Sequence, residues 1–156
     1  MAKLKAPLRK LYAVILAVIA AGLPVASLAS SPAAGQQIEG RWYTEAYVAI
    51  GEPLYQQHCA ACHGVKGQGL AEDWKKRLPD GSYPPPPLNG TAHTWHHSMS
   101  VLVRTIQRGG AEFGGKMPAF AGQLSTAEML AIIAYLQNWW PEEIYQAWQQ
   151  RGGLDQ

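Results

Sequence analysis

Apolar side chains recur at three- and four-residue spacing in several stretches of this chain, a pattern typical of amphipathic helices. The clearest stretch begins at Ser125, which can form a capping box with Glu128, and ends before Pro141. Its apolar positions are Met129, Ile132, Ile133 and Leu136. Two shorter helices are expected, one over about residues 100–108, which Gly109 ends, and one over residues 142–150.

A further helix is expected before the two cysteines. Thr44 suits an N-cap, and an approximately helical apolar pattern runs from Tyr47 to Cys59. Pro53 conflicts with one straight helix, so either the helix kinks there or the main helix begins at Pro53. Residues 64–90 and 109–124 are rich in glycine and proline and are expected to be loops. No segment alternates with period two for long enough to suggest a sheet, so the predicted fold class is all-α and loop-rich.

The first 29 residues have the order of a secretory signal: a basic stretch, an apolar run, and a small-x-small cleavage site that ends at Ala29. The competing interpretation is an uncleaved anchor, since residues 8–29 are almost long enough to span a bilayer. Both interpretations place the remainder in the bacterial periplasm, either free or held at the inner membrane. We expect a disordered linker over residues 30–40, a folded domain over 41–140, and a tail with a short helix over 141–156.

The charge of the chain argues against one class of partner, and its expected low burial of apolar surface favours a bound cofactor. The formal net charge is +2, but four of the 13 basic residues lie in the first ten positions, and the rest of the chain has nine basic against eleven acidic residues, or −2. This balance argues against nucleic acid as a partner. Three or four short helices among long loops bury little apolar surface, and a large apolar cofactor would supply the missing core.

The motif Cys59-Ala60-Ala61-Cys62-His63 carries the chemistry. Two thiols three positions apart on a helix can reach the two vinyl groups of one haem, and the next residue can bind its iron as the proximal ligand. A thioredoxin-like redox pair would need a surrounding βαβ pattern, which is absent, and a structural zinc site would need a second pair of ligands. The motif therefore predicts one covalently attached haem c, with His63 on the iron.

The sixth iron ligand has to come from elsewhere in the chain. Met117 is the best candidate, because it lies in a loop that Pro118 stiffens and because a thioether is a soft ligand that raises the haem potential. Met99 is the remaining rival, since Met129 belongs to the core pattern of a helix.

The region from about Arg41 to Trp140 resembles a class I c-type cytochrome, on the basis of the haem motif, the later Met117-Pro118 and a C-terminal amphipathic helix. The resemblance implies that the first and last helices of the domain cross closely, with Gly51 and Tyr55 against Tyr135. It also implies that Pro87 offers its carbonyl oxygen to His63. About ten extra residues, including 71–82, separate this proline from the haem motif.

Several residues have weaker signals. Trp95 and Arg104 are candidates for contacts to haem propionates, with a core tryptophan and a solvated arginine as the alternatives. Basic residues in the loops could steer an acidic redox partner, or form an ordinary solvated surface. These are Lys66, Lys75, Lys76, Arg77 and Lys116. The aromatic end of the chain, with Tyr145 and Trp148, is expected to pack back on the domain rather than to bind a partner.

An iron with two strong axial ligands has no open position for a substrate. The sequence therefore predicts a one-electron carrier or electron-transfer subunit rather than an enzyme, acting on unnamed donor and acceptor proteins, either free or docked to a membrane respiratory complex. One alternative is a haem peroxidase or gas-binding protein, which would need Met117 to be labile. Another alternative is a copper-handling haem protein. His93, His96 and His97 lie close together in the sequence, and copper accepts imidazole ligands.

Overall fold

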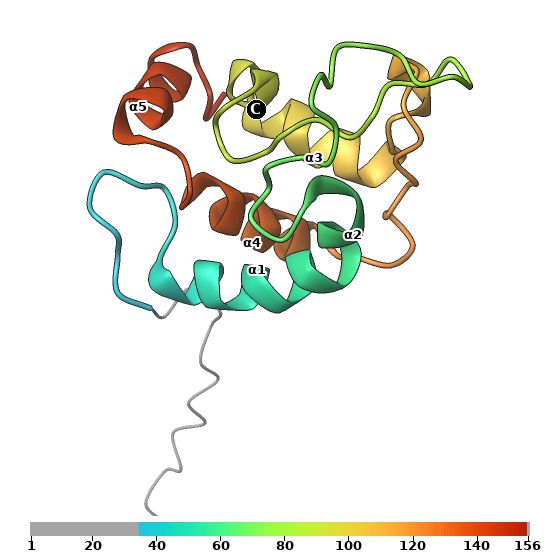
Figure 1. Ribbon diagram of the computed structural model, residues 1–156. Coiled ribbons are helices and arrows are strands. Elements are labelled where there is room, and N and C mark those ends of the chain that lie inside the picture. Colours follow the sequence, from blue (N-terminus) through green and yellow to red (C-terminus); the bar gives the residue numbers. More distant parts are fainter. Residues whose placement is uncertain (1–34, 156) are drawn as a thin grey trace, which may run out of the picture.

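The structure is a computed structural model that describes residues 35–155, and it is built from short helices joined by long loops (Figure 1). The helices are α1 (Glu45–His58), α2 (Ala60–His63), the 3-10 helix η1 (His93–His96), α3 (Met99–Arg108), the 3-10 helix η2 (Ala111–Phe113), α4 (Thr126–Gln137) and α5 (Glu142–Gln150). Within residues 35–155, β pairing is limited to two isolated bridges. The predicted all-α, loop-rich fold is confirmed.

Helices α1 and α4 pack against each other, with α1 along the lower edge of the view in Figure 1 and α4 behind it. Gly51 is buried where the two helices cross, and a Cβ atom at this position would overlap the carbonyl group of Ala131. Next to it the rings of Tyr55 and Tyr135 lie 5.6 Å apart. The crossing predicted from Gly51, Tyr55 and Tyr135 is therefore confirmed, and glycine is needed there because it allows the backbones to approach.

Helix α1 is continuous across Pro53, so the alternative in which the helix begins at this proline is wrong. The helix begins after Thr44, whose backbone is extended as expected of an N-cap, although its side chain makes no capping hydrogen bond. Gly51 and Tyr55 are buried on either side of the proline, which is itself exposed. Packing against α4 thus holds both halves of the helix in line and outweighs the loss of one backbone donor.

Helix α4 begins with the predicted capping box. The backbone N–H of Ser125 donates to Glu128 Oε2 at 2.8 Å, and the backbone N–H of Glu128 donates to Ser125 Oγ at 3.3 Å. Met129 and Ile132 are each 1 % exposed, which confirms that this methionine belongs to the core. Helix α3 starts one residue earlier than expected and ends at Gly109 as expected, but none of its residues is buried.

The tail packs back on the domain, as expected. Tyr145 and Trp148 of α5 are buried in a second cluster with Tyr43 and Trp140. The indole N–H of Trp148 donates to the carbonyl oxygen of His97 at 2.8 Å, which ties α5 to the segment that contains η1. The tail is therefore part of the folded unit.

The segment before α1 also differs from expectation. Gln37 pairs with Thr44 in an isolated antiparallel bridge, and the N–H of Glu45 donates to the carbonyl oxygen of Gln36 at 3.0 Å. The expected disordered linker is thus wrong for residues 35–40, because their backbone bonds to the start of α1. Residues 30–34 and the signal segment 1–29 lie outside the described residues. No helix between residues 35 and 155 is long and apolar enough to cross a membrane.

Candidate haem site

The cysteine motif lies where α1 ends and α2 begins. Cys59 has a non-helical backbone between the two helices, and its N–H donates to the carbonyl oxygen of Tyr55 at 2.8 Å. The N–H groups of Cys62 and His63 both donate to the carbonyl oxygen of Cys59, at 3.1 and 2.9 Å. Cys59 is half-buried, Cys62 is exposed, and both are free thiols. A single tight turn therefore holds the two thiols and the imidazole together.

His63 is oriented by a backbone carbonyl. The side chain is only 8 % exposed, and Nδ1 lies 2.8 Å from the carbonyl oxygen of Pro86. A carbonyl can only accept, so Nδ1 carries the proton and the lone pair of Nε2 is left to bind a metal. Burial lowers the pKa of His63, and the bond to Pro86 opposes this shift in part. The neutral imidazole that iron requires is thus favoured.

The prediction that Pro87 is the partner of His63 is wrong by one residue. The carbonyl oxygen of Pro87 instead accepts a hydrogen bond from Thr94 Oγ1 at 3.1 Å. Successive carbonyl groups in an extended chain point in different directions, so one proline of the run faces the histidine and the next faces the η1 segment. The sequence has four prolines in a row, and the resemblance that selected Pro87 does not distinguish it from its neighbour Pro86.

Backbone pairing places the proline run over the histidine. The N–H of Leu88 donates to the carbonyl oxygen of Gly67 at 2.6 Å, and the N–H of Gly69 donates to that of His63 at 2.7 Å. Gly69 has φ +75°, and a Cβ atom there would press on the ring of Pro87. The two loops therefore approach closely because this position has no side chain.

Two aromatic side chains support the same loops, and sequence reasoning gave them no such role. The hydroxyl of Tyr55 donates to the carbonyl oxygen of Gly64 at 2.6 Å, directly after the haem motif. The indole N–H of Trp140 donates to the carbonyl oxygen of Leu88 at 2.8 Å. Both residues are buried. A polar role for a buried tyrosine or tryptophan is expected in general, but the sequence does not reveal the acceptor.

Met117 lies on the same core as the haem motif. It is partly buried and packs, like Cys59 and Leu88, against the cluster that contains Tyr55. Its carbonyl oxygen accepts from the N–H of Gly110 at 3.0 Å. Met99, the rival ligand, packs against the second cluster with the aromatic residues of α5. The structure thus brings Met117 and Cys59 to one core and Met99 to another.

The residues of this region fit a covalently bound haem. The donor set consists of two free thiols, an imidazole with an available Nε2 and a soft thioether. Helix α3 adds an apolar face, since Val103 and Ile106 contact the core cluster while no residue of the helix is buried by protein.

Comparison with known proteins agrees with this donor set. The sequence model of the family described as cytochrome C oxidase, cbb3-type, subunit III, matches residues 46–136, which is more than half of the chain and includes all four donor residues. The chain belongs to this family. It is accordingly a c-type cytochrome, which is a class of electron-transfer proteins that bind haem c.

Individual relatives are similar over part of their length. The chain is 28 % identical over 109 residues to the cbb3-type cytochrome c oxidase subunit CcoP of Rhodobacter capsulatus, which covers 65 % of this chain and 32 % of the relative. It is 32 % identical over 91 residues to a CcoP subunit of an Azospirillum species, covering 58 % and 28 %. It is also 30 % identical over 120 residues to a thiosulfate dehydrogenase of Stutzerimonas stutzeri, covering 71 % and 36 %. The chain spans about a third of the length of these relatives. No solved structure matches it significantly.

These relatives correct one expectation. The sequence predicted that the protein is not an enzyme, whereas the relatives are subunits of an oxidase and a dehydrogenase. The prediction was wrong because it was argued from the axial ligands of one haem. Two occupied axial positions mean that this iron does not itself bind a substrate. They do not indicate whether the haem delivers electrons to an enzyme of which the chain is a subunit.

The residues with weaker signals as haem-propionate or partner contacts lie in different parts of the structure. Trp95 is half-buried beside His96, with the guanidinium of Arg151 5.6 Å from its ring. Arg104 is exposed on α3. Their contact with haem propionates stays a prediction. Among the basic loop residues, Lys116 forms an ion pair with Asp80, and steering of an acidic partner by this group of residues also stays a prediction.

The three histidines of the η1 segment point to different neighbours. The ring of His93 stacks on Trp74 with centroids 4.6 Å apart, and its edge meets His97 at 5.3 Å. His96 is exposed and lies against Trp95. Among residues 35–155, no group of three or more His, Cys, Asp or Glu side chains is arranged to hold a metal ion. The cytochrome therefore gives the copper alternative no geometric support.

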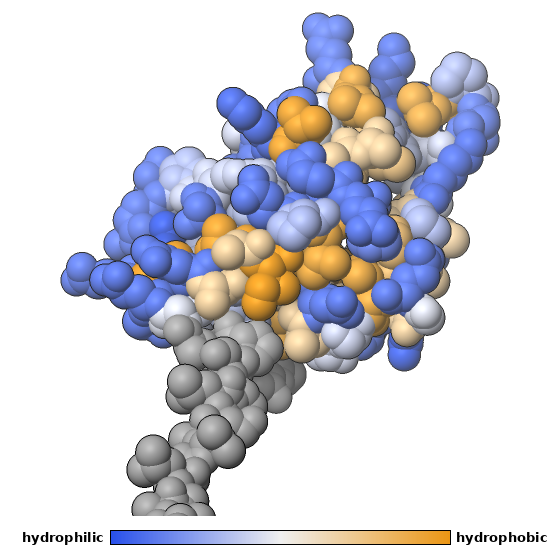
Figure 2. Space-filling view, turned by 90° about the horizontal axis from the view of Figure 1, so that it is seen from below, coloured by the Kyte–Doolittle hydropathy of each residue, from blue (hydrophilic) through white to orange (hydrophobic). Residues whose placement is uncertain are grey.

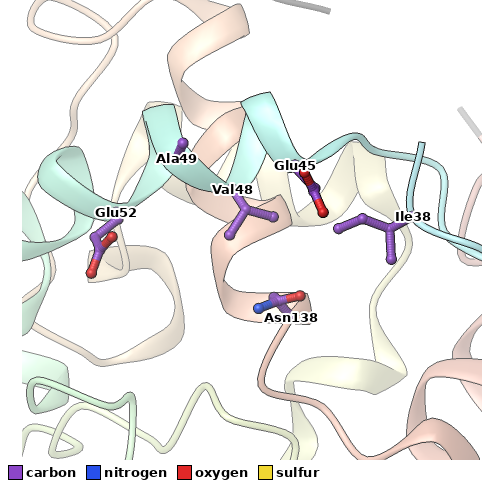
Figure 3. Close-up of a pocket in the computed structure, with 6 residues that line it drawn as sticks. All are labelled: Ile38, Glu45, Val48, Ala49, Glu52 and Asn138. Carbon is purple, nitrogen blue, oxygen red and sulfur yellow. The ribbon is translucent and has the colours of Figure 1, made fainter. Parts of the chain in front are cut away.

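A shallow groove of about 340 Å³ lies elsewhere, between α1, the segment before it and the end of α4 (Figure 3). It is lined by Ile38, Glu45, Val48, Ala49, Glu52 and Asn138. Figure 2 shows that apolar side chains gather on the face of the molecule that is seen from below. The groove contains two carboxylates but none of the donors of the haem site.

Proposed function

We propose that this chain is a periplasmic electron-transfer domain that carries one haem c and serves a membrane respiratory oxidase. The proposal for a single haem is supported by the presence of one haem motif and only two cysteines in the sequence. Cys59 and Cys62 would hold the haem, and His63 and Met117 would bind its iron. When bound, haem iron supplies a one-electron ferric–ferrous couple.

The observation that carries the proposal is the hydrogen bond between His63 Nδ1 and the carbonyl oxygen of Pro86, at 2.8 Å, directly beside the two thiols. It fixes the tautomer and the ring orientation and increases the basicity of Nε2. Burial of His63 excludes water from the ring. Met117 is the better supported sixth ligand, because it shares a core cluster with Cys59 and its backbone is held by Gly110.

The relatives suggest the electron acceptor. The CcoP relatives are subunits of cbb3-type oxidases, and the N-terminal sequence predicts export, so a membrane oxidase facing the periplasm is the partner that we propose. Residues 1–29 would act either as a cleaved signal or as an anchor that keeps the domain at the membrane.

The first experiment uses purified holo-protein to test which methionine is the sixth iron ligand. The oxidised protein should show the near-infrared charge-transfer band of sulfur ligation, and Met117→Ala should abolish the band and lower the potential, because loss of the thioether stabilises the ferric state. Met99→Ala is the matched control and should leave the band in place. A band that survives Met117→Ala and vanishes in Met99→Ala would transfer the role to Met99.

Electron transfer is tested with two assays. Reduced holo-protein should be oxidised by membranes that contain a cbb3-type oxidase and not by membranes that lack it. Oxidised holo-protein is then mixed with thiosulfate, because one relative is a thiosulfate dehydrogenase. Reduction by thiosulfate alone, without oxidation by the oxidase membranes, would replace the proposed function with thiosulfate oxidation.

A further inference from the structure

The extra residues between the haem motif and the proline run fold back onto the loop that carries Met117. In Figure 1 this loop reaches the segment around η2 at the upper right. The N–H of Tyr83 donates to the carbonyl oxygen of Gly114 at 2.9 Å, and Tyr83 forms a parallel bridge with Gly115. Two segments that are about 30 residues apart in sequence are therefore paired through their backbones.

Side chains reinforce this pairing on the solvent side. The carboxylate of Asp80 forms an ion pair with the ammonium group of Lys116, the residue directly before Met117. The guanidinium of Arg77 lies over the ring of Tyr83, 4.1 Å from its centroid. Both contacts are exposed, so each is expected to be weak on its own.

The pairing continues to the backbone of Met117. Gly115 donates its N–H to the carbonyl oxygen of Gly110 at 3.0 Å, and Gly110 donates its own N–H to the carbonyl oxygen of Met117 at 3.0 Å. Tyr83 and Met117 therefore belong to one backbone hydrogen-bond network.

The other end of the extra segment is fixed as well. Trp74 stacks on His93, with centroids 4.6 Å apart and an angle of 16° between the rings. His93 belongs to η1, directly before α3. A segment held at one end only would follow the Met117 loop when that loop moves, whereas one held at both ends opposes the movement.

We propose that residues 74–83 form a strap that restrains the Met117 loop, with Asp80 and Tyr83 as positioning residues for the sixth iron ligand. The inference rests on the proposed function, because it requires Met117 to bind the iron. A thioether ligand exchanges with external ligands when its loop opens. Since opening would break the strap contacts, the strap lowers the population of the open loop and thereby the apparent affinity of the oxidised protein for external ligands.

Charge reversal tests the strap in oxidised holo-protein, with imidazole as the external ligand. Asp80→Lys and Lys116→Asp each replace an attraction with a repulsion. Each should raise the apparent affinity for imidazole about fivefold, equivalent to about 1 kcal/mol. The protein that carries both substitutions restores the ion pair and should return to within about twofold of the parent. Glu72→Lys makes the same change of charge in the preceding part of the segment and should leave the affinity unchanged.

A Met117→Ala background separates this inference from the proposed function. Asp80→Lys should have no further effect on imidazole binding there, because the strap acts through Met117. A parent-like affinity in Asp80→Lys, no recovery in the double reversal, or the same increase without Met117 would each overturn the strap. If Met117→Ala itself changed neither the near-infrared band nor imidazole binding, the ligand assignment of the proposed function would fail instead.

Discussion

Helices α4 and α3 differ in sequence and in surroundings, because α4 is apolar on most of its sides whereas α3 has one apolar and one polar face. Eight of the twelve residues of α4 are buried by protein, whereas none of the ten residues of α3 is, although Val103 and Ile106 contact the core. Helix α4 is therefore stabilised by α1, and α3 presents an apolar face of the kind that a haem would cover. From this difference we expect one half of the domain to have a core of protein and the other half to have a core that the haem completes.

Removal of the haem attachment should give the largest effect. In the Cys59→Ala, Cys62→Ala double variant, acid-acetone extraction should leave no haem on the protein, because no covalent bond holds it. The amount of protein that accumulates in the cell should also fall steeply, because the domain loses part of its core. Hydrogen exchange on any protein recovered should show faster exchange in α3 than in α4. A colourless variant with native stability would contradict the cofactor-dependent core.

Matched truncations compare the two helices directly. Ile132→Ala removes a side chain that is 1 % exposed on α4 and should lower the free energy of unfolding by about 2–5 kcal/mol. Ile106→Ala on α3 should cost less in unfolding but should alter the haem spectrum, since its neighbour would be the cofactor. Denaturant unfolding followed by circular dichroism and by haem absorbance checks both. Equal costs with no spectral change would remove the distinction between the helices.

The crossing of α1 and α4 offers a narrower test. Gly51→Val places side-chain atoms against the carbonyl group of Ala131 and should destabilise the protein by about 1–3 kcal/mol, the usual cost of overpacking. Ala49→Val, on an exposed position of the same helix, controls for the lower helix propensity of valine. The two variants should differ in their urea midpoints by most of this cost, and identical midpoints would show that α1 can shift at the crossing.

The capping box of α4 gives the smallest effect and a pH dependence. Hydrogen bonds from the backbone N–H and hydroxyl of Ser125 lower the pKa of Glu128 below its ordinary value of 4.5. A carboxyl group with a lowered folded-state pKa stabilises the protein above pH 4.5, and this contribution is lost as the pH falls through the folded-state pKa. Glu128→Gln should therefore lower the unfolding midpoint slightly at pH 7 and have no effect at low pH. The same small decrease at all pH values would mean that the charge plays no part.

Local chemistry explains which elements could be predicted. The capping box at Ser125, the stop at Gly109 and the start of α5 after Pro141 all depend on neighbouring residues, and each was found where it was expected. The haem motif is equally local, because one turn holds both thiols and the imidazole. Relations across the crossing helices were predicted only through the resemblance to a known family.

Sequence alone determined the positions of α3, α4 and α5, the cysteine motif with His63, and the candidate methionines. Tertiary structure decided that α1 continues through Pro53, that Pro86 rather than Pro87 faces His63, and that Met117 shares a core with Cys59 while Met99 does not. Each of these depends on contacts between segments that are distant in the chain. The way in which two loops or helices meet decides which groups form hydrogen bonds and which side chains pack there. The spacing of residues within one segment does not show how a second, distant segment will contact it.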